Sequence, residues 1–220
     1  MRKFKVGDKV KVKRAETNIK GRGTIISIDE SDMLLSLPYE VKIDSEEMSV
    51  YNPFDEGVSW FSEDDLEVLD GLNVYLAGPF FSDSQIEIVK DLNKSLQKNE
   101  TIGNIFVPME HQMNDGDLVE FTSPWAKAVA MNDYKNVRES DIVVAIVDFD
   151  GQDMDSGTAA ELGYAYATGR PVFLYHAKNH DMMVNLMATE VAKAYFTNLE
   201  EIEKYDFIKA EHKPFTGNYR

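Results

Sequence analysis

The most constraining feature of this 220-residue sequence is a segment of small residues that follows an apolar run. Residues 142–147 read Ile-Val-Val-Ala-Ile-Val, a β-branched run without alternation, which is typical of a strand buried on both faces of a parallel sheet. Residues 155–165 then read Asp-Ser-Gly-Thr-Ala-Ala-Glu-Leu-Gly-Tyr-Ala. Asp155 or Ser156 can cap a helix there, and Gly169 ends it. Because open α/β sheets bind ligands where strands end and helices begin, we expect the functional site at this junction.

The chain contains two parts with different patterns. Residues 1–70 hold short strand-like runs separated by turn signals, which predict a small all-β barrel. From residue 71 strands alternate with helices, which predicts a doubly wound parallel sheet of about five strands. We therefore expect a barrel domain at residues 1–70 and an α/β domain at residues 71–220. The tail, residues 213–220, has no periodicity, and we expect either a disordered end or an arm that lies on a neighbouring subunit.

Composition excludes several classes of function. The absence of cysteine excludes disulfides, thiolate nucleophiles and cysteine-based zinc sites, and it is compatible with a reducing cytosol. No segment approaches the ~20 apolar residues that span a bilayer, and the basic N-terminus lacks the apolar core of a signal peptide. We therefore expect a soluble, cytoplasmic protein. The net charge of −16 repels phosphate backbones, so we do not expect nucleic acid as a partner.

The charge is unevenly distributed within the first 70 residues. Residues 1–23 hold nine Lys or Arg against Asp8 and Glu16, whereas residues 24–70 hold fourteen Asp or Glu against Lys42. We favour pairing of the basic strands with acidic neighbours in one small barrel over a dedicated basic binding face.

The same part of the chain resembles SH3-like barrel modules. The resemblance rests on Val-Gly-Asp-Lys-Val at residues 6–10, Gly-x-Gly-Thr-Ile-Ile at residues 21–26 and Trp-Phe at residues 60–61. It implies a module for interaction or oligomerisation and no catalysis.

Two carboxylates are the strongest candidates for chemistry. Glu161 is flanked by small and apolar residues, which is unusual for a solvated side chain, although a glutamate on the exposed side of a helix also fits the sequence. Asp133 lies in an apolar stripe whose members are spaced three and four residues apart, from Ala126 to Val137. A charge there must be paired, protonated or functional. No basic residue shares that face, so we favour a functional role for Asp133.

Other candidates have plain structural explanations as well. Asp155 is suited to cap its helix, and Tyr75 has the position of a core aromatic. Phe80 and Phe81 could stack on a flat ligand or close their loop over the core. The four histidines lack metal-ligand spacing, so we expect no metal site. The loop at Gly78 lacks the second and third glycines of a pyrophosphate cradle.

Four segments in this order resemble the nucleoside 2-deoxyribosyltransferase family over residues 73 to about 210. They are Val-Tyr-Leu-Ala-Gly-Pro-Phe-Phe at 74–81, Asn-Asp at 132–133, the segment 155–165 and Asn-Leu-Met at 185–187. The most specific is Asp-x-Gly-x-x-x-Glu-Leu-Gly-Tyr-Ala. The resemblance implies a flavodoxin-like sheet and an enzyme, a pentosyltransferase, that moves a 2-deoxyribosyl group between the bases of free deoxyribonucleosides. It implies a covalent glycosyl-glutamate intermediate, retention of configuration and no cofactor.

The resemblance also implies roles for individual residues. Glu161 would be the nucleophile, Asp133 would give a proton to the departing base and take one from the incoming base, and Tyr75 would orient the nucleophile. Asp155, together with Asn185 from a neighbouring subunit, would hold the sugar 5′-hydroxyl, which implies a homo-oligomer with shared sites. We also assign four loop residues to substrate binding: Gly78, Phe80, Phe81 and Gly157.

Two alternatives remain open. A branch related to this family hydrolyses the glycosidic bond of nucleoside monophosphates. It has a small residue with a hydroxyl group at the position of Asp155. An aspartate accepts a hydrogen bond from a 5′-hydroxyl but repels a phosphate, so Asp155 favours free nucleosides. It does not decide between transfer and hydrolysis, so a nucleoside or nucleotide N-glycoside hydrolase is the first alternative. The second is a non-catalytic nucleoside or nucleotide sensor with the barrel as its output module.

Overall fold

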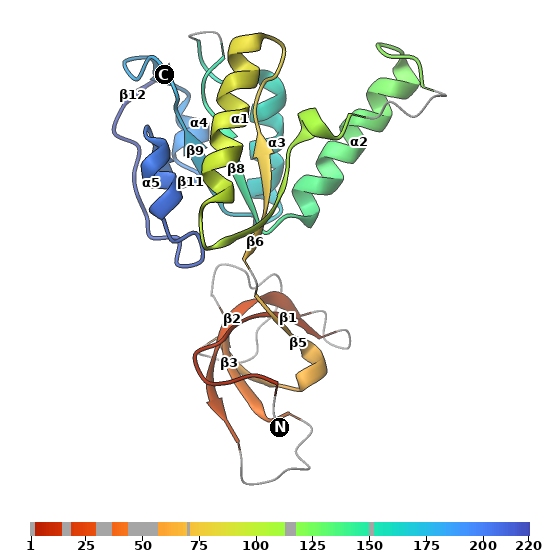
Figure 1. The fold of residues 1–220 in the computed structure, drawn as a ribbon, viewed down its shortest axis with the longest axis vertical. Helices are drawn as coiled ribbons and strands as arrows, with labels where there is room; N and C mark the ends of the chain where they lie inside the picture. Colours follow the sequence, from red (N-terminus) through yellow and green to blue (C-terminus); the bar gives the residue numbers. More distant parts are fainter. Residues whose placement is uncertain are drawn as a thin grey trace. The chain divides into compact units, whose positions relative to one another are not determined.

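A computed structural model describes residues 3–14, 19–29, 37–43, 57–69, 71–112, 118–149 and 152–220. The chain divides into two compact units, Met1–Leu69 and Asp70–Arg220, and each is described here by itself (Figure 1). No helix within those residues is long and apolar enough to cross a membrane.

The N-terminal unit is an antiparallel sheet with the strand order β4-β3-β2-β1-β5. Its apolar residues alternate, so that one face, including Val10, Val12 and Ile25, packs into a small core. In the described residues the edge strands β4 and β5 do not pair with each other. The sheet is therefore open there, and the expected SH3-like closed barrel is not confirmed. The elements are β1 (Lys9–Arg14), β2 (Ile19–Ile28), β3 (Tyr39–Ile43), β4 (Val58–Phe61), the 3₁₀ helix η1 (Glu63–Asp65) and β5 (Leu66–Val68).

The register of this sheet bears on the expected charge pairing. Lys11 of β1 is the partner of Glu67 of β5, which is the pairing of opposite charges that we expected. Beyond this register, the expected pairing of the basic strands with acidic neighbours stays a prediction.

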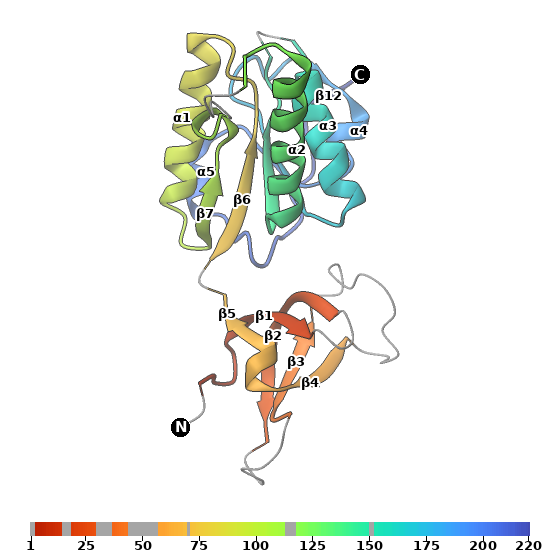
Figure 2. The ribbon, with the colours of Figure 1, turned by 90° about the vertical axis from the view of Figure 1, so that its right-hand side faces the viewer.

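The second unit contains a five-stranded parallel sheet with the order β11-β9-β8-β6-β7. When these strands are numbered 1 to 5 in chain order and read from β7 to β11, the order is 2-1-3-4-5. This is the flavodoxin-like order, and it confirms the predicted α/β core. Figure 2 shows α1 and α5 on one face of the sheet and α2 and α3 on the other. The strands of the sheet are β6 (Leu72–Ala77), β7 (Ile102–Phe106), β8 (Ile142–Ile146), β9 (Val172–Tyr175) and β11 (Ala192–Phe196). The longer helices are α1 (Asp83–Gln97), α2 (Ser123–Glu139), α3 (Ser156–Ala167) and α5 (Leu199–Lys204), with η2 (Pro108–Glu110) and α4 (Leu186–Thr189) between them.

The centre of this sheet determines where a site can form. All five residues of β8 are buried, as its unalternating sequence predicts, and β8 pairs with β6. The chain leaves β6 and β8 in opposite directions across the sheet, so a crevice is expected beyond their carboxyl ends. Gly78 follows β6, and a Cβ there would lie 2.7 Å from Cδ1 and 3.2 Å from Cβ of Ile146. A glycine is therefore suited to the close passage of this loop against β8.

The C-terminal tail folds onto its own unit, which contradicts both of our expectations for it. β12 (Asn218–Tyr219) pairs in parallel with β10 (Met183–Val184). Further back, the amide of Tyr195 donates to the carbonyl of Lys213 at 3.0 Å. The ring of Phe215 packs edge-on against Tyr195 with 4.8 Å between ring centroids. Backbone pairing and this aromatic contact hold the segment in place.

Replacing two glycines of the second unit by alanine should change the free energy of unfolding in opposite directions. Gly71 has a φ of +95°, and a Cβ there would lie 2.5 Å from the backbone nitrogen of Gly103. We expect Gly71→Ala to lower the free energy of unfolding by about 1 to 3 kcal/mol. Gly163 lies inside α3 with nothing within 4 Å of an added Cβ, so Gly163→Ala should raise it by roughly 0.5 to 1 kcal/mol. Urea denaturation of both variants checks this, and shifts of the same sign would contradict it.

Candidate active site

Three of the predicted residues, from three separate elements, lie together. Tyr75 is fully buried in β6, and its hydroxyl donates a hydrogen bond to Oε1 of Glu161 in α3 at 2.5 Å. The negative charge of Asp133 in α2 raises the pKa values of both Glu161 and Tyr75. Asp133 is therefore close enough to act on both groups, and the three side chains form one cluster.

Local structure explains why Glu161 faces this cluster. Asp155 caps α3, because its Oδ2 accepts hydrogen bonds from the amides of Gly157 at 2.9 Å and Thr158 at 3.1 Å. Leu162 and Ala165, three residues apart, are buried in the core. Glu161 precedes Leu162 and so lies about 100° around the helix from that buried face. This position directs its carboxylate to the edge of the core, where the hydroxyl of Tyr75 in β6 meets it.

The environment of Glu161 brings its titration close to neutral pH. The pKa of Glu161 is raised to about 7 from an ordinary value of 4.5, and burial is the largest cause. The hydrogen bond from Tyr75 acts in the opposite direction, and the charges of Asp133 and Asp155 contribute smaller increases. Burial and the charges of Glu161 and Asp133 also raise the pKa of Tyr75 far above its usual range, so Tyr75 remains a donor. The carboxylate is thus fixed in position by a group that favours its ionised form.

Asp133 has an environment that favours its protonated form. Burial raises the pKa of Asp133 to about 6, against an ordinary value of 3.8. The apolar stripe that first indicated this residue is not itself buried: of the α2 side chains only Val137 is fully buried, whereas Ala126 and Ala130 are exposed. Asp133 therefore belongs to the cluster but does not lie within a buried helix face.

Two aromatic residues that the sequence did not indicate extend the cluster. Phe106, at the end of β7, stacks on Tyr75 with 5.6 Å between ring centroids, and His111 stacks on Phe106 at 4.6 Å. The available signal was the position of Phe106, because β7 ends at the same edge of the sheet as β6. His111 is exposed, so the row of rings leads from the buried Tyr75 to the surface.

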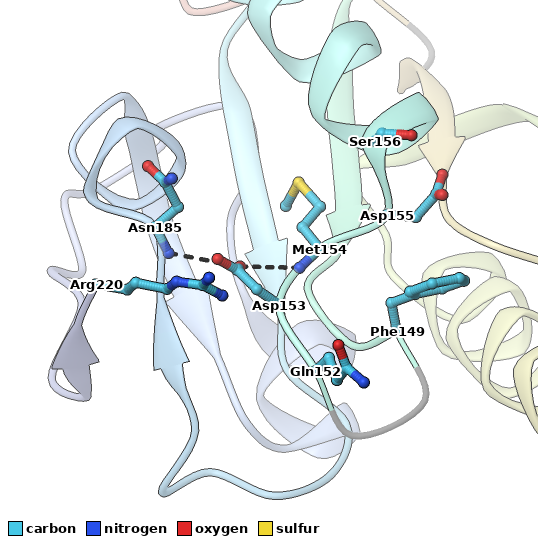
Figure 3. Close-up of a pocket in the computed structure, with 8 residues that line it drawn as sticks. All are labelled: Phe149, Gln152, Asp153, Met154, Asp155, Ser156, Asn185 and Arg220. Carbon is cyan, nitrogen blue, oxygen red and sulfur yellow. Dashed lines mark hydrogen bonds between the residues drawn. The ribbon is translucent and has the colours of Figure 1, made fainter.

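Asp155 and Asn185 lie on one pocket of about 500 Å³ beside the cluster (Figure 3). The pocket and the cluster meet at Asp155, whose charge acts on Glu161. Asn185 belongs to the same chain here, and its side chain caps α4 by accepting a hydrogen bond from the amide of Met187 at 2.9 Å. The remaining lining residues are Phe149, Gln152, Asp153, Met154, Ser156 and Arg220. The sequence did not indicate Arg220, because the tail has no periodicity. The pairing of β12 with β10 places Arg220 at this pocket.

The other predicted loop residues have mainly structural contacts. Phe80 and Phe81 stack on each other with 5.5 Å between centroids, and Phe81 is 70% exposed. The amide of Gly157 is used by the Asp155 cap, and a Cβ on Gly157 would lie 2.9 Å from Oδ2 of Asp155. No group of three or more His, Cys, Asp or Glu in the described part of the chain is arranged to hold a metal ion.

The family comparison covers this whole site. A family model described as nucleoside 2-deoxyribosyltransferase matches residues 74–215. With the flavodoxin-like sheet, this match identifies the α/β unit as that of a transferase enzyme. The chain belongs to the nucleoside 2-deoxyribosyltransferase family. The matched residues include every predicted site residue and leave the N-terminal unit outside.

Individual relatives agree with the family match. A nucleoside deoxyribosyltransferase of Limosilactobacillus fermentum is 30% identical over 153 residues, which are 64% of this chain and 90% of that protein. The 2-deoxyribosyltransferase of Bacillus psychrosaccharolyticus is 33% identical with a TM-score of 0.57, and the match covers 66% of this chain and 99% of that one. A conserved protein from Enterococcus faecalis V583 shares the fold, with 24% identity, a TM-score of 0.52 and coverage of 60% and 95%.

The raised pKa of Glu161 predicts how its substitution affects stability. Between pH 4.5 and about 7 the folded protein keeps this proton while the unfolded chain releases it, so the carboxyl lowers stability as pH rises. Glu161→Gln should therefore be more stable than the natural protein above pH 7, by about 1 to 3 kcal/mol, and the gain should vanish near pH 4. Urea denaturation across this pH range measures it. Glu87→Gln, on the exposed side of α1, is the matched control, and the prediction is wrong if both variants show the same trend.

Proposed function

We propose that this chain transfers the 2-deoxyribosyl group between the bases of free 2′-deoxyribonucleosides through a covalent intermediate on Glu161, with retention at the anomeric carbon. The observation that carries the proposal is the contact of Tyr75 with Glu161, with Asp133 close enough to shift both. Glycosyl transfer with retention needs one ionised carboxylate and a second group that gives and takes a proton. These two acids supply both functions.

The proposed reaction has two displacements. In the first, the Glu161 carboxylate attacks C1′, the C1′–N bond breaks, and the electron pair remains on the base nitrogen, which takes a proton from Asp133. In the second, the Asp133 carboxylate takes a proton from the incoming base, whose nitrogen attacks C1′ and releases Glu161. Two inversions give net retention, and every proton and electron pair is accounted for without a cofactor.

The substrate class rests on the charge at the far end of the site. Asp155 can accept a hydrogen bond from a sugar 5′-hydroxyl and repels a 5′-phosphate. Arg220 lines the same pocket, and its positive charge would attract a phosphate. Asp153 adds a second negative charge to the lining. With two negative groups against one positive group, the pocket favours an uncharged 5′ end. The names of the relatives, nucleoside deoxyribosyltransferase and 2-deoxyribosyltransferase, agree with free nucleosides and bases as substrates.

We further propose that the enzyme is a homo-oligomer with a shared site. Large apolar side chains are exposed directly after Asn185, with Leu186 at 48% and Met187 at 70%. A second exposed group includes Phe121 at 88%, just before α2, and Met131 at 57%. Surfaces of this kind are typical of subunit contacts. An SH3-like N-terminal module that assists association fits the same proposal.

A transfer assay with mass analysis tests the proposed function. Wild type incubated with deoxyinosine and cytosine should form deoxycytidine, and with deoxyinosine alone it should gain the mass of one deoxyribosyl group. In Glu161→Gln the adduct should be absent and the transfer rate should fall by about 10³-fold or more, because the nucleophile is lost. Glu87→Gln should behave as wild type. Free deoxyribose without deoxycytidine would favour the hydrolase, and binding without turnover, unchanged in Glu161→Gln, would favour the sensor.

The two shifted acids predict the pH dependence of kcat/KM. The first displacement needs Glu161 ionised and Asp133 protonated, so the rate should fall below a pKa of about 7 as Glu161 gains a proton. It should also fall above a pKa of about 6 as Asp133 loses its proton. The plot of kcat/KM against pH should be a narrow bell with its maximum between these values. Because the two acids interact, the pKa values read from its two limbs describe the pair and not either residue alone. Steady-state rates from pH 4.5 to 9 measure it, and a flat plateau across pH 6 to 8 would contradict the assignment. Asp133→Asn should remove the alkaline limb.

A further inference from the structure

The helix that carries Asp133 is anchored mainly at its C-terminal end. Val137 is the one α2 residue that is fully buried, and Nη2 of Arg170 donates to the carbonyl of Arg138 at 2.6 Å. Midway along α2, Met131 is 57% exposed, and nearer the N-terminus Pro124 and Ala126 are exposed. Figure 1 shows that end of the helix standing away from the sheet. The placement of Asp133 therefore depends on contacts within the last two turns of α2.

One aromatic contact joins α2 to α3 at the level of the two acids. The rings of Tyr134 and Tyr164 meet edge-on, with 5.0 Å between centroids and 65° between planes. Tyr134 directly follows Asp133 in α2, and Tyr164 lies three residues after Glu161, about one turn further along α3. Tyr134 also raises the pKa of Tyr75, so it lies close to the hydroxyl that holds Glu161. The ring pair thus adjoins both halves of the cluster.

Among the residues that the structure describes, no polar contact joins α2 to α3 beside this pair of rings. The side-chain amide of Asn136 donates to the carbonyl of Asn132, within α2 itself. The Arg170 contact reaches α2 from beyond the end of α3. No hydrogen bond or ion pair between α2 and α3 occurs in the described ranges, so packing sets the separation of the two helices near the acids.

We propose that Tyr164 is a positioning residue whose ring, packed against Tyr134, sets the distance between Asp133 and Glu161. The inference rests on the proposed function, because it concerns how the proton donor reaches a base bonded to the sugar that Glu161 attacks. A displacement of about 1 Å in a reacting geometry can lower a rate by about 10²-fold. Loss of the ring should therefore slow the displacement of a base that needs the Asp133 proton. The attack of Glu161 on a sugar whose leaving group needs no proton should stay largely intact.

A pair of substrates separates positioning from general damage to the fold. Deoxyinosine requires protonation of its leaving base, whereas an aryl 2-deoxyribofuranoside releases a phenolate that needs no proton. In Tyr164→Leu we expect the first displacement, measured as the pre-steady-state release of the leaving group, to slow by about 10- to 100-fold with deoxyinosine and by less than about threefold with the aryl glycoside. Tyr164→Phe keeps the ring and should retain both rates. Asp133→Asn should show the same selective loss as Tyr164→Leu, and it serves as the reference.

The controls make each result decisive. Tyr166→Leu, two residues along the same helix at a side chain that is 61% exposed, should leave both rates unchanged. Tyr134→Leu, on the less buried helix, should reproduce the selective loss and replaces Tyr164→Leu if that variant fails to fold. The double variant should be no worse than either single one, since both remove one contact. Equal slowing of both substrates, additive losses, or a Tyr164→Phe variant as slow as Tyr164→Leu would overturn the proposal. Absence of transfer in wild type would overturn the proposed function instead.

Discussion

The site depends on keeping one carboxylate ionised in a place that disfavours its charge. Glu161 is withdrawn from water and stands near two further acids, and both effects raise its pKa. The opposing interaction is the hydrogen bond from Tyr75, whose hydroxyl lies 2.5 Å from Oε1 and cannot ionise at ordinary pH. A carboxylate held in this way is fixed in direction and only weakly solvated. In the proposed transfer it is therefore better prepared to attack carbon than a hydrated surface carboxylate would be.

The fold supplies this interaction through the middle of its sheet. β6 and β8 are buried parallel neighbours whose carboxyl ends lie at the same edge, so a residue near the end of β6 can meet the helix that follows β8. Tyr75 comes from the first of these and Glu161 from the second, while Asp155 caps that helix and borders the adjoining pocket. The packing of Gly78 against Ile146 keeps the two strand ends close. The two buried strands thus fix the positions of Tyr75 and Glu161. The remaining acid, Asp133, is supplied by α2.

The sequence was informative wherever a local pattern determines structure. The unalternating run of β8, the cap at Asp155 and the small-residue helix predicted a junction that the structure contains, and the strand pattern predicted the parallel sheet. Contacts between distant segments had no such signal. The stacking of Phe106 on Tyr75, the stacking of His111 on Phe106 and the pairing of β12 with β10 all depend on tertiary placement. The stripe at Asp133 had helical spacing, but spacing alone does not say which face is covered.

The two acids also explain how substrate could complete the site. With pKa values of about 7 and about 6, both acids titrate close to neutral pH, so the form with Glu161 ionised and Asp133 protonated competes with the opposite one. A base that covers Asp133 removes water from it and raises its pKa further, whereas the hydrogen bond from Tyr75 continues to favour ionised Glu161. Binding of the base therefore moves the shared proton towards Asp133, where the proposed reaction needs it. The same shift requires Asp133 to lie under the base, so the proposed catalysis depends on how firmly α2 is held against α3.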